Sequence, residues 1–338
     1  MPDTLTLAGA RAARFGRSAV GALELVGRSA AILRAQELTR RAAAVEGGVL
    51  LVADRGADVE SVARELHERS RPPTAPYVVV ACAAGDPLGL ARVLFGDVTD
   101  HTPSDLESVA SDSRIAAACG GTLFLQDIAD LPAAVQARLA RVTRDGEARI
   151  NGQATATGVR WVASASPGID ADVHGNRFRA DLYRRLAVSR IDLPPLRDRA
   201  EDVPVVAVRL LDELCAERRL AARTFTQTAL ALLGALTWPG NLAELRAVVE
   251  RVVADARAEV IQIEDLLPAL HLDRATAPFA PAGNLREARL RFERDYIAAV
   301  LQHHGWRMAD AAQTLGIQRP NLYRKARQLG IPLAKVSE

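Results

Sequence analysis

Five apolar runs, each separated from the next by a stretch with helical periodicity, constrain the fold of this chain more than any other feature. The runs are rich in Val, Leu and Ile and occupy residues 48–53, 76–83, 121–128, 159–166 and 188–196. Strands of this composition that alternate with helices are typical of a parallel sheet buried on both faces. We therefore predict an α/β body in which helices cover both faces of a parallel sheet.

The same pattern divides the 338 residues into five segments. Residues 1–22 show no sustained period, and we expect a flexible arm there. Residues 23–195 carry the α/β body, and residues 196–271 turn all-helical, which predicts a small helical lid. Residues 272–283 are rich in helix breakers and indicate a linker. Residues 284–338 are again helical and are predicted to form a separate domain.

Charge is distributed unevenly, although the net charge of the chain is only +2. From residue 284 to the end, ten basic side chains are opposed by five acidic ones. A local basic excess on a near-neutral protein indicates a module that binds a polyanion. No apolar run reaches the ~18 residues of a membrane span, no signal-peptide pattern is visible, and the three cysteines are isolated. We expect a cytoplasmic, nucleoid-associated protein without membrane contact.

The stretch "GWRMADAAQTLGIQRPNLYRKARQLGI" predicts a helix-turn-helix. Gly316 suits the tight turn, and Pro320 suits the start of the second helix, where its missing N–H is no loss. Leu322, Ala326 and Leu329 form the inward face of that helix. Side chains that read base edges point outward (Gln318, Arg319, Asn321 and Arg324), and Lys325 and Arg327 suit phosphates. An ordinary solvated surface helix is the alternative, but the agreement of turn, proline and apolar spacing favours DNA binding.

This tail resembles the Fis-type helix-turn-helix at the carboxyl end of NtrC-like bacterial enhancer-binding proteins, with Trp306 as a departure from the family's usual asparagine. The preceding helix places one apolar stripe at packing distance (Leu285, Ala288, Phe292, Tyr296, and Ala299 or Val300). In Fis-like folds the corresponding helix pairs two chains. The resemblance therefore implies a homodimer or higher homo-oligomer on a palindromic operator in double-stranded DNA. Packing of the stripe within one chain is the alternative.

The body, from about Leu25 to Leu270, resembles the AAA+ ATPase domain of the same family. The matching motifs follow one another in the family's order: "LVGRSAAI", "GGTLFLQDIADLP", "FRADLYRRL", "IDLPPLRDRAEDVP" and "WPGNLAEL". The resemblance implies an AAA+ α/β subdomain with a helical lid, followed by an all-α helix-turn-helix domain.

The residues of the expected nucleotide site depart from the family. A phosphate-binding loop needs glycines and a lysine, but here only Gly56 remains, Asp58 replaces the last glycine and Val59 replaces the lysine. The Walker B carboxylates are Gln126 and Asp127, and the arginine of the second sensor is Ala243. An amide does not supply the charge that holds magnesium. We therefore predict a degenerate site with no cofactor, no metal and no catalytic residue, that is, a pseudo-ATPase and not an enzyme.

Arg179 and Arg185 match the family's arginine fingers, but a structural role as ion-pair partners is the preferred interpretation. The family's "GAFTGA" loop, which contacts the sigma-54 form of RNA polymerase, has no counterpart here. Its place is taken by the polar, acidic stretch "DVTDHTPSDLESVASDSRIAAA".

We expect a sequence-specific DNA-binding transcriptional regulator that works without ATP hydrolysis and without sigma-54, with the body used for oligomerisation. RNA polymerase and an active AAA+ homologue are the further partners to consider. Two alternatives stay open. The chain could insert into rings of an active homologue, using Arg179 and Arg185 on a neighbour, or it could sense a ligand in the altered pocket.

Overall fold

The chain divides into two compact units, Met1–Leu270 and His271–Glu338. The computed structural model describes residues 21–83, 87–97, 105–256, 258–275, 297, 301, 308, 311–312 and 319–329. The finer division into five segments stays a prediction. The arm at residues 1–20 and the linker beyond residue 275 lie outside the described residues.

The first unit contains the predicted parallel sheet. Its five strands lie in the order β2-β4-β7-β1-β8, and every neighbouring pair is parallel. Each strand falls within one of the five apolar runs: β1 (Val49–Val52), β2 (Tyr77–Ala81), β4 (Thr122–Gln126), β7 (Arg160–Ala165) and β8 (Ser189–Asp192). The prediction of a parallel α/β body is confirmed.

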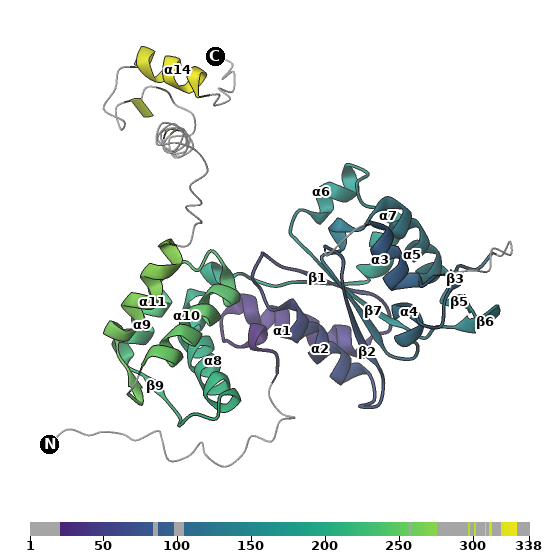
Figure 1. Cartoon of the computed structure of the whole chain (residues 1–338), viewed down its shortest axis with the longest axis horizontal. Coiled ribbons are helices and arrows are strands. Elements are labelled where there is room, and N and C mark those ends of the chain that lie inside the picture. The colour runs from purple at the N-terminus through teal and green to yellow at the C-terminus, as the bar shows by residue number, and fades with distance from the viewer. Residues whose placement is uncertain are drawn as a thin grey trace. The chain divides into compact units, whose positions relative to one another are not determined.

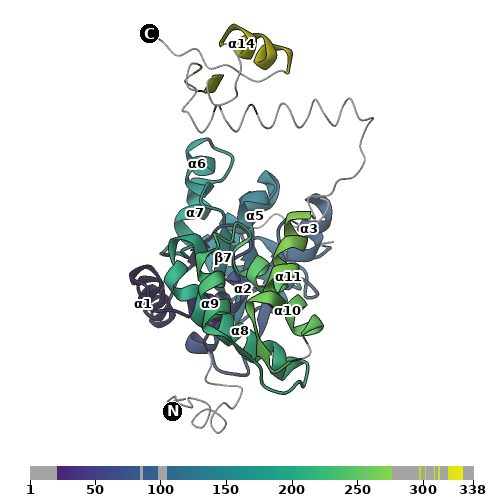
Figure 2. The same cartoon turned by 90° about the vertical axis from the view of Figure 1, so that its left-hand side faces the viewer.

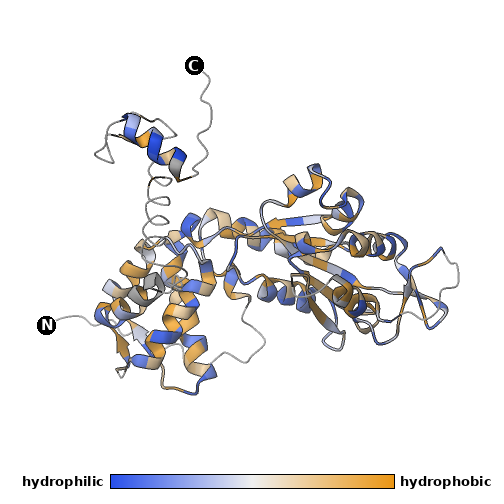
Figure 3. Cartoon of the chain, turned by 45° about the horizontal axis from the view of Figure 1, so that its top comes forward, coloured by the Kyte–Doolittle hydropathy of each residue, from blue (hydrophilic) through white to orange (hydrophobic). Residues whose placement is uncertain are grey.

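Alternate residues of the strands enter two separate cores, because side chains of a strand point to opposite faces in turn. Val49 and Leu51 pack with α1 (Ala30–Ala44) and α2 (Val59–Ser70). Leu50 and Val52 pack on the opposite face with α3 (Pro87–Phe95), α4 (Arg114–Ala117), α5 (Ala133–Asp145), α6 (Ile169–His174) and α7 (Ala180–Leu186). Figure 2 shows α1 and α3 on opposite sides of β7. In Figure 3 the strands of the sheet are coloured mainly as hydrophobic.

A second, smaller sheet was not predicted. It has the order β3-β5-β6 and consists of β3 (Ser108–Val109), β5 (Glu147–Ile150) and β6 (Gln153–Ala156). The β5–β6 hairpin turns at Asn151 and Gly152, both of which have positive φ. Its sequence, "EARINGQATA", is largely polar and exposed, so it lacks the apolar run on which the other strands were predicted.

The lid belongs to the first unit, except for the end of its last helix beyond Leu270, and has its own core. It comprises α8 (Val203–Glu217), α9 (Gln227–Ala235), α10 (Asn241–Asp255) and α11 (Ile263–Ala275), which gather on one side of the unit in Figure 1. Trp238 is buried among them, and its indole N–H donates a 2.8 Å hydrogen bond to the carbonyl of Leu233. The prediction of an all-helical lid holds except for one short parallel pair, β9 (Thr224–Phe225) and β10 (Val260–Ile261).

In the second unit, α14 (Arg319–Gln328) is the predicted second helix of the helix-turn-helix. Leu322 and Ala326 are buried, as predicted, in one cluster with Ile297, Leu301, Met308, Ala311 and Ala312, and Leu329 packs against it. Gly316, Trp306 and Gln318 lie outside the described residues. So does the predicted dimerisation stripe (Leu285, Ala288, Phe292, Tyr296, Ala299 and Val300).

Candidate functional site

The loop between β1 and α2 occupies the place of a phosphate-binding loop, and Gly56 is the residue that fixes its shape. Gly56 has φ +85°, a conformation that a side chain rarely tolerates. A Cβ atom at this position would also overlap the carbonyl oxygen of Gly240, in the turn before α10. Both the backbone conformation and the close approach of the lid therefore require glycine here.

Asp58 and Val59 both act as structural parts of α2. The carboxylate of Asp58 accepts a 3.1 Å hydrogen bond from the N–H of Ser61 and so caps the helix, where a negative charge also suits the helix dipole. Val59 is 8% exposed and lies in the core shared by α1 and α2. The first carbon atoms of a lysine side chain at this position would lie in an apolar core.

Glu24, a residue that the sequence analysis missed, reaches the same helix start from the 3-10 helix at Leu23–Leu25. Its carboxylate is 2% exposed and accepts a 2.8 Å hydrogen bond from the backbone N–H of Asp58. It also pairs with the guanidinium of Arg199, which is 1% exposed and donates a second bond, of 2.6 Å, to the Glu24 carbonyl. Burial raises the pKa of Glu24, although Arg199 and the Asp58 N–H act in the opposite direction. No signal in the sequence links residues so far apart.

The lid is bonded directly to this loop. The N–H of Ala243 donates a 2.9 Å hydrogen bond to the carbonyl of Gly56. The side chain of Asn241 is buried, donates 2.8 Å to the carbonyl of Arg55 and accepts 3.0 Å from the N–H of Leu196. Three of the predicted residues, Gly56, Asp58 and Ala243, are thus brought together across the junction of body and lid.

A cavity of about 300 Å³ lies at this junction. It is lined by Gly56, Ala57, Asp58, Leu242, Ala243 and Arg246. Arg246 is a further residue of this region that was not predicted from the sequence. It follows Ala243 by one helical turn and is paired with Glu250 at 2.9 Å and Glu217 at 3.4 Å. The arginine that lines the cavity is therefore already paired with two carboxylates.

Gln126 and Asp127 lie at the end of β4 and do not line that cavity. Asp127 has φ 57°, and its N–H donates a 3.0 Å bond to the hydroxyl of Ser164 on β7. Partial burial and the neighbouring Asp130 raise the pKa of the Asp127 carboxyl. Among the residues that the structure describes, no group of three or more His, Cys, Asp and Glu side chains could hold a metal ion.

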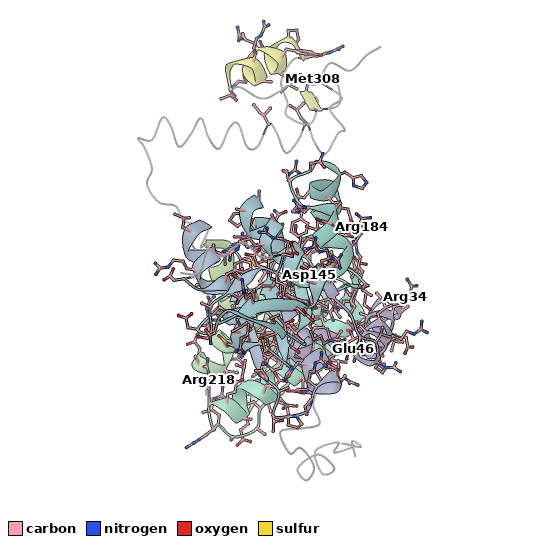
Figure 4. All side chains as sticks on the ribbon, turned by 90° about the vertical axis from the view of Figure 1, so that its right-hand side faces the viewer. Arg34, Glu46, Asp145, Arg184, Arg218 and Met308 are labelled. Carbon is pink, nitrogen blue, oxygen red and sulfur yellow. The ribbon has the colours of Figure 1, made fainter. Side chains whose placement is uncertain are left out.

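Arg179 and Arg185 are exposed beside and on α7, and neither lines the cavity at Gly56. Arg179 forms two hydrogen bonds to Asp181, of 3.0 and 2.7 Å. A hydrogen bond from Arg144, helped by the charges of Arg185 and Arg141, lowers the pKa of Asp145 at the end of α5. Figure 4 labels Asp145 and also Arg184, the exposed neighbour of Arg185. Arg179 is thus paired with Asp181, and the charge of Arg185 acts on Asp145.

In α14 the predicted DNA-contacting side chains face away from the cluster formed by Leu322 and Ala326. Arg319, Asn321, Arg324 and Arg327 are exposed and Lys325 is half-buried. Arg324 donates a 3.4 Å hydrogen bond to the side-chain oxygen of Asn321. α14 contains no acidic residue. The exposed surface of α14 thus carries several cations and the Asn321 amide, and the role of each residue stays a prediction.

Three families match consecutive parts of the chain. The Sigma-54 interaction domain matches residues 25–192, the AAA+ ATPase lid domain residues 197–281 and the bacterial regulatory protein, Fis family, residues 289–329. The nitrogen assimilation regulatory protein NtrX of Azorhizobium caulinodans is 34% identical, covering 91% of this chain and 69% of the relative. The chain belongs to the sigma-54 enhancer-binding protein family. The transcriptional regulatory protein ZraR of Escherichia coli is another relative, 35% identical over 89% of this chain and 68% of its own.

Solved structures agree with this membership of the sigma-54 enhancer-binding protein family. NtrX from Brucella abortus in complex with ADP has 31% identity and a TM-score of 0.63, and covers 90% of this chain and 70% of its own. The same protein in complex with ATP has 29% identity and a TM-score of 0.61, and covers 90% and 69%. The predicted AAA+ fold and Fis-type helix-turn-helix are confirmed. The chain is a transcriptional regulator with a DNA-binding helix-turn-helix domain.

The prediction that the chain is not an enzyme is wrong. The chain carries an AAA+ ATPase lid domain, and NtrX, its relative in the enhancer-binding family, holds ADP and ATP. The prediction weighed the loop side chains alone. The strand, turn and helix that form a nucleotide framework are present as β1, the Gly56 loop and α2. Within that framework the side chains do not fit a triphosphate held by lysine, because Val59 is in the core and the Glu24 carboxylate takes the Asp58 N–H.

Proposed function

We propose that this chain is a sequence-specific DNA-binding regulator whose binding to its operator does not depend on ATP hydrolysis or on sigma-54. It acts as a homodimer or higher oligomer on a palindromic site, in the cytoplasm at the nucleoid, and the AAA+ body supports self-association. One observation carries the proposal. The loop at Gly56 is fastened to the lid by Asn241 and Ala243, and to Glu24 through Asp58. Direct hydrogen bonds within the protein therefore join the body and the lid at this loop.

The face of α14 supports the DNA-binding part of this proposal. Arg319, Asn321 and Arg324 are exposed within the first six residues of the helix, and the N-terminal part of the recognition helix contacts base edges in helix-turn-helix proteins. Arg pairs with guanine and Asn with adenine through two hydrogen bonds each. Arg327 and Lys325, further along, suit phosphates.

The region between Phe95 and Ala118 supports independence from sigma-54. Its sequence is polar and acidic and lacks "GAFTGA". Where this segment rejoins the fold, Glu107 is buried and paired with Arg138 and Arg141. The Arg138 guanidinium also lies 3.8 Å from the centre of the Phe95 ring, which ends α3. Contacts with α5 and α3 therefore hold the segment at Glu107. We expect this part of the segment to keep one position and not to move as a loop that contacts a partner.

The experiment is selection of DNA by the purified full chain from a random pool, first without nucleotide and then with ATP and magnesium. We expect the same palindrome with an affinity unchanged within about twofold, and we expect Arg319→Ala to remove the preference for one base pair in each half-site. Asp127→Ala serves as the matched control for the nucleotide site and should leave binding unchanged. Binding that appears only with ATP, or that Asp127→Ala removes, would overturn the proposal.

A second candidate is a subunit that joins rings of an active relative. The exposure of Arg179 and Arg185 at the surface favours it, although Arg179 already pairs with Asp181. Co-expression with an active family member would test this. Co-purification that Arg185→Ala abolishes, together with no DNA selected by the chain alone, would replace the first proposal by this one.

A further inference from the structure

Tyr323 is a large aromatic side chain left exposed on the DNA-facing side of α14. It is 41% exposed, whereas Leu322 beside it and Ala326 are fully buried. A single exposed aromatic residue is not unusual at a protein surface, so the contacts of Tyr323 decide whether it has a binding role. No function was predicted for Tyr323 from the sequence.

The ring of Tyr323 lies against an arginine that is predicted to read DNA. The guanidinium carbon of Arg319 is 5.8 Å from the ring centre, and the two residues are one helical turn apart. This is the range in which a cation is attracted to the face of an aromatic ring. Because α14 has no acidic residue, no carboxylate of the same helix competes for the Arg319 guanidinium.

An arginine on a helix surface samples many rotamers, and bidentate recognition of guanine requires its planar fork to face the base edge. A ring that holds the guanidinium plane reduces the number of orientations lost on binding. The neighbouring pair has a similar arrangement, because Arg324 donates to the side-chain oxygen of Asn321 at 3.4 Å. Each of the two base-reading arginines therefore has one partner within the same helix.

We infer that Tyr323 is a specificity-determining positioning residue, which holds Arg319 in the orientation that reads one guanine of each half-site. This inference rests on the proposed DNA-binding function. It assigns the ring face, and not the phenolic hydroxyl, as the functional part of the side chain.

The test uses the full chain as wild type and as Tyr323→Ala, Tyr323→Phe, Arg319→Ala and the double variant Tyr323→Ala/Arg319→Ala. Each protein is given a random DNA pool, and affinities are then measured on duplexes that differ at one base pair. Arg327→Ala is the control for a phosphate contact and should weaken all duplexes alike. Thermal unfolding checks that each variant is folded.

We expect Arg319→Ala to remove the preference for one guanine, and Tyr323→Ala to reduce that same preference about threefold or more, the size of an exposed cation–π contact. Tyr323→Phe should keep the preference. The double variant should match Arg319→Ala, because two residues that act together are not additive.

Three results would overturn the inference: an unchanged preference in Tyr323→Ala, an effect at a base different from that of Arg319→Ala, or equal losses in Tyr323→Phe and Tyr323→Ala. If wild type itself selects no sequence, the proposed function fails as well. If wild type selects a palindrome and Tyr323→Ala keeps its preference, only this inference fails.

Discussion

The backbone N–H of Asp58 donates a 2.8 Å hydrogen bond to the carboxylate of Glu24, so an acidic side chain of this chain holds the start of α2. Helix starts of this kind bind phosphates in many proteins, since their N–H groups and the helix dipole favour anions. Here Glu24 supplies the anion, and Asp58 itself caps the next turn. Arg199 joins this carboxylate to the segment that leads into the lid.

Replacement of Glu24 by Gln should destabilise the first unit. The change leaves the buried Arg199 charge without its partner, which costs about 3 kcal/mol in the free energy of unfolding. Urea denaturation followed by circular dichroism measures this. Glu37→Gln is the control, because Glu37 pairs with Arg40 and Arg41 at the surface, where an ion pair contributes about 0.5 kcal/mol. Equal effects of the two changes would contradict the prediction.

Replacement of Gly56 by Ala should be far more harmful than replacement of Gly152. Both glycines have positive φ, but a Cβ on Gly152 meets no atom within 4 Å, whereas one on Gly56 meets the carbonyl of Gly240. Gly152→Ala should therefore cost about 1 kcal/mol, and Gly56→Ala about 3 kcal/mol or more. Thermal melts of the two variants provide the comparison, and similar melting temperatures would refute it.

Asn241 joins the lid to the Gly56 loop. Two substitutions of Asn241 distinguish the contribution of its side-chain hydrogen bonds to stability from that of its backbone conformation. Asn241 has φ 51°. Asn241→Gly removes the bonds to Arg55 and Leu196 without strain and should cost about 2 kcal/mol. Asn241→Ala should cost about 1 kcal/mol more, because alanine disfavours the left-handed conformation. Amide exchange of residues 53–58 should quicken in both variants. Unchanged exchange would mean that Asn241 does not hold the loop.

Stability should decrease as the pH falls through the ordinary range of histidine because of His67. His67 is buried, its Nδ1 lies 2.9 Å from the hydroxyl of the buried Thr122, and burial lowers its pKa in the folded state. Below about pH 6.5 the unfolded chain therefore binds a proton that the folded chain resists, which favours unfolding. Unfolding free energies measured from pH 7.5 to 5 should fall, and His67→Asn should flatten that slope. If the unfolding free energy of His67→Asn falls with pH as steeply as that of wild type, another group causes the effect.

The sheet could be predicted from the sequence because its strands lie within runs that contain several apolar side chains, although in β8 itself (Ser189–Asp192) only Ile191 is apolar. The inward face of α14 could be predicted from the spacing of Leu322 and Ala326. The β5–β6 hairpin could not, because its strands are polar. The contacts of Glu24 and Asn241 were also out of reach, since their partners are distant along the chain and a buried polar residue has no characteristic sequence pattern. The prediction that the chain is not an enzyme was wrong because it rested on the replaced side chains of the Gly56 loop. It did not consider the backbone framework of β1, loop and α2, which is present.

Hydrogen bonds join the lid to the body, from Asn241 and Ala243 to Arg55, Gly56 and Leu196. These bonds limit where the gene can be divided. A polypeptide that stops before the lid would leave the carbonyls of Arg55 and Gly56 without their donors and would uncover the surface against which α10 packs. We therefore expect a polypeptide that contains the body to fold only if it extends to about Leu270, where the first compact unit ends. Exchange of modules between relatives should succeed after that residue and fail within it.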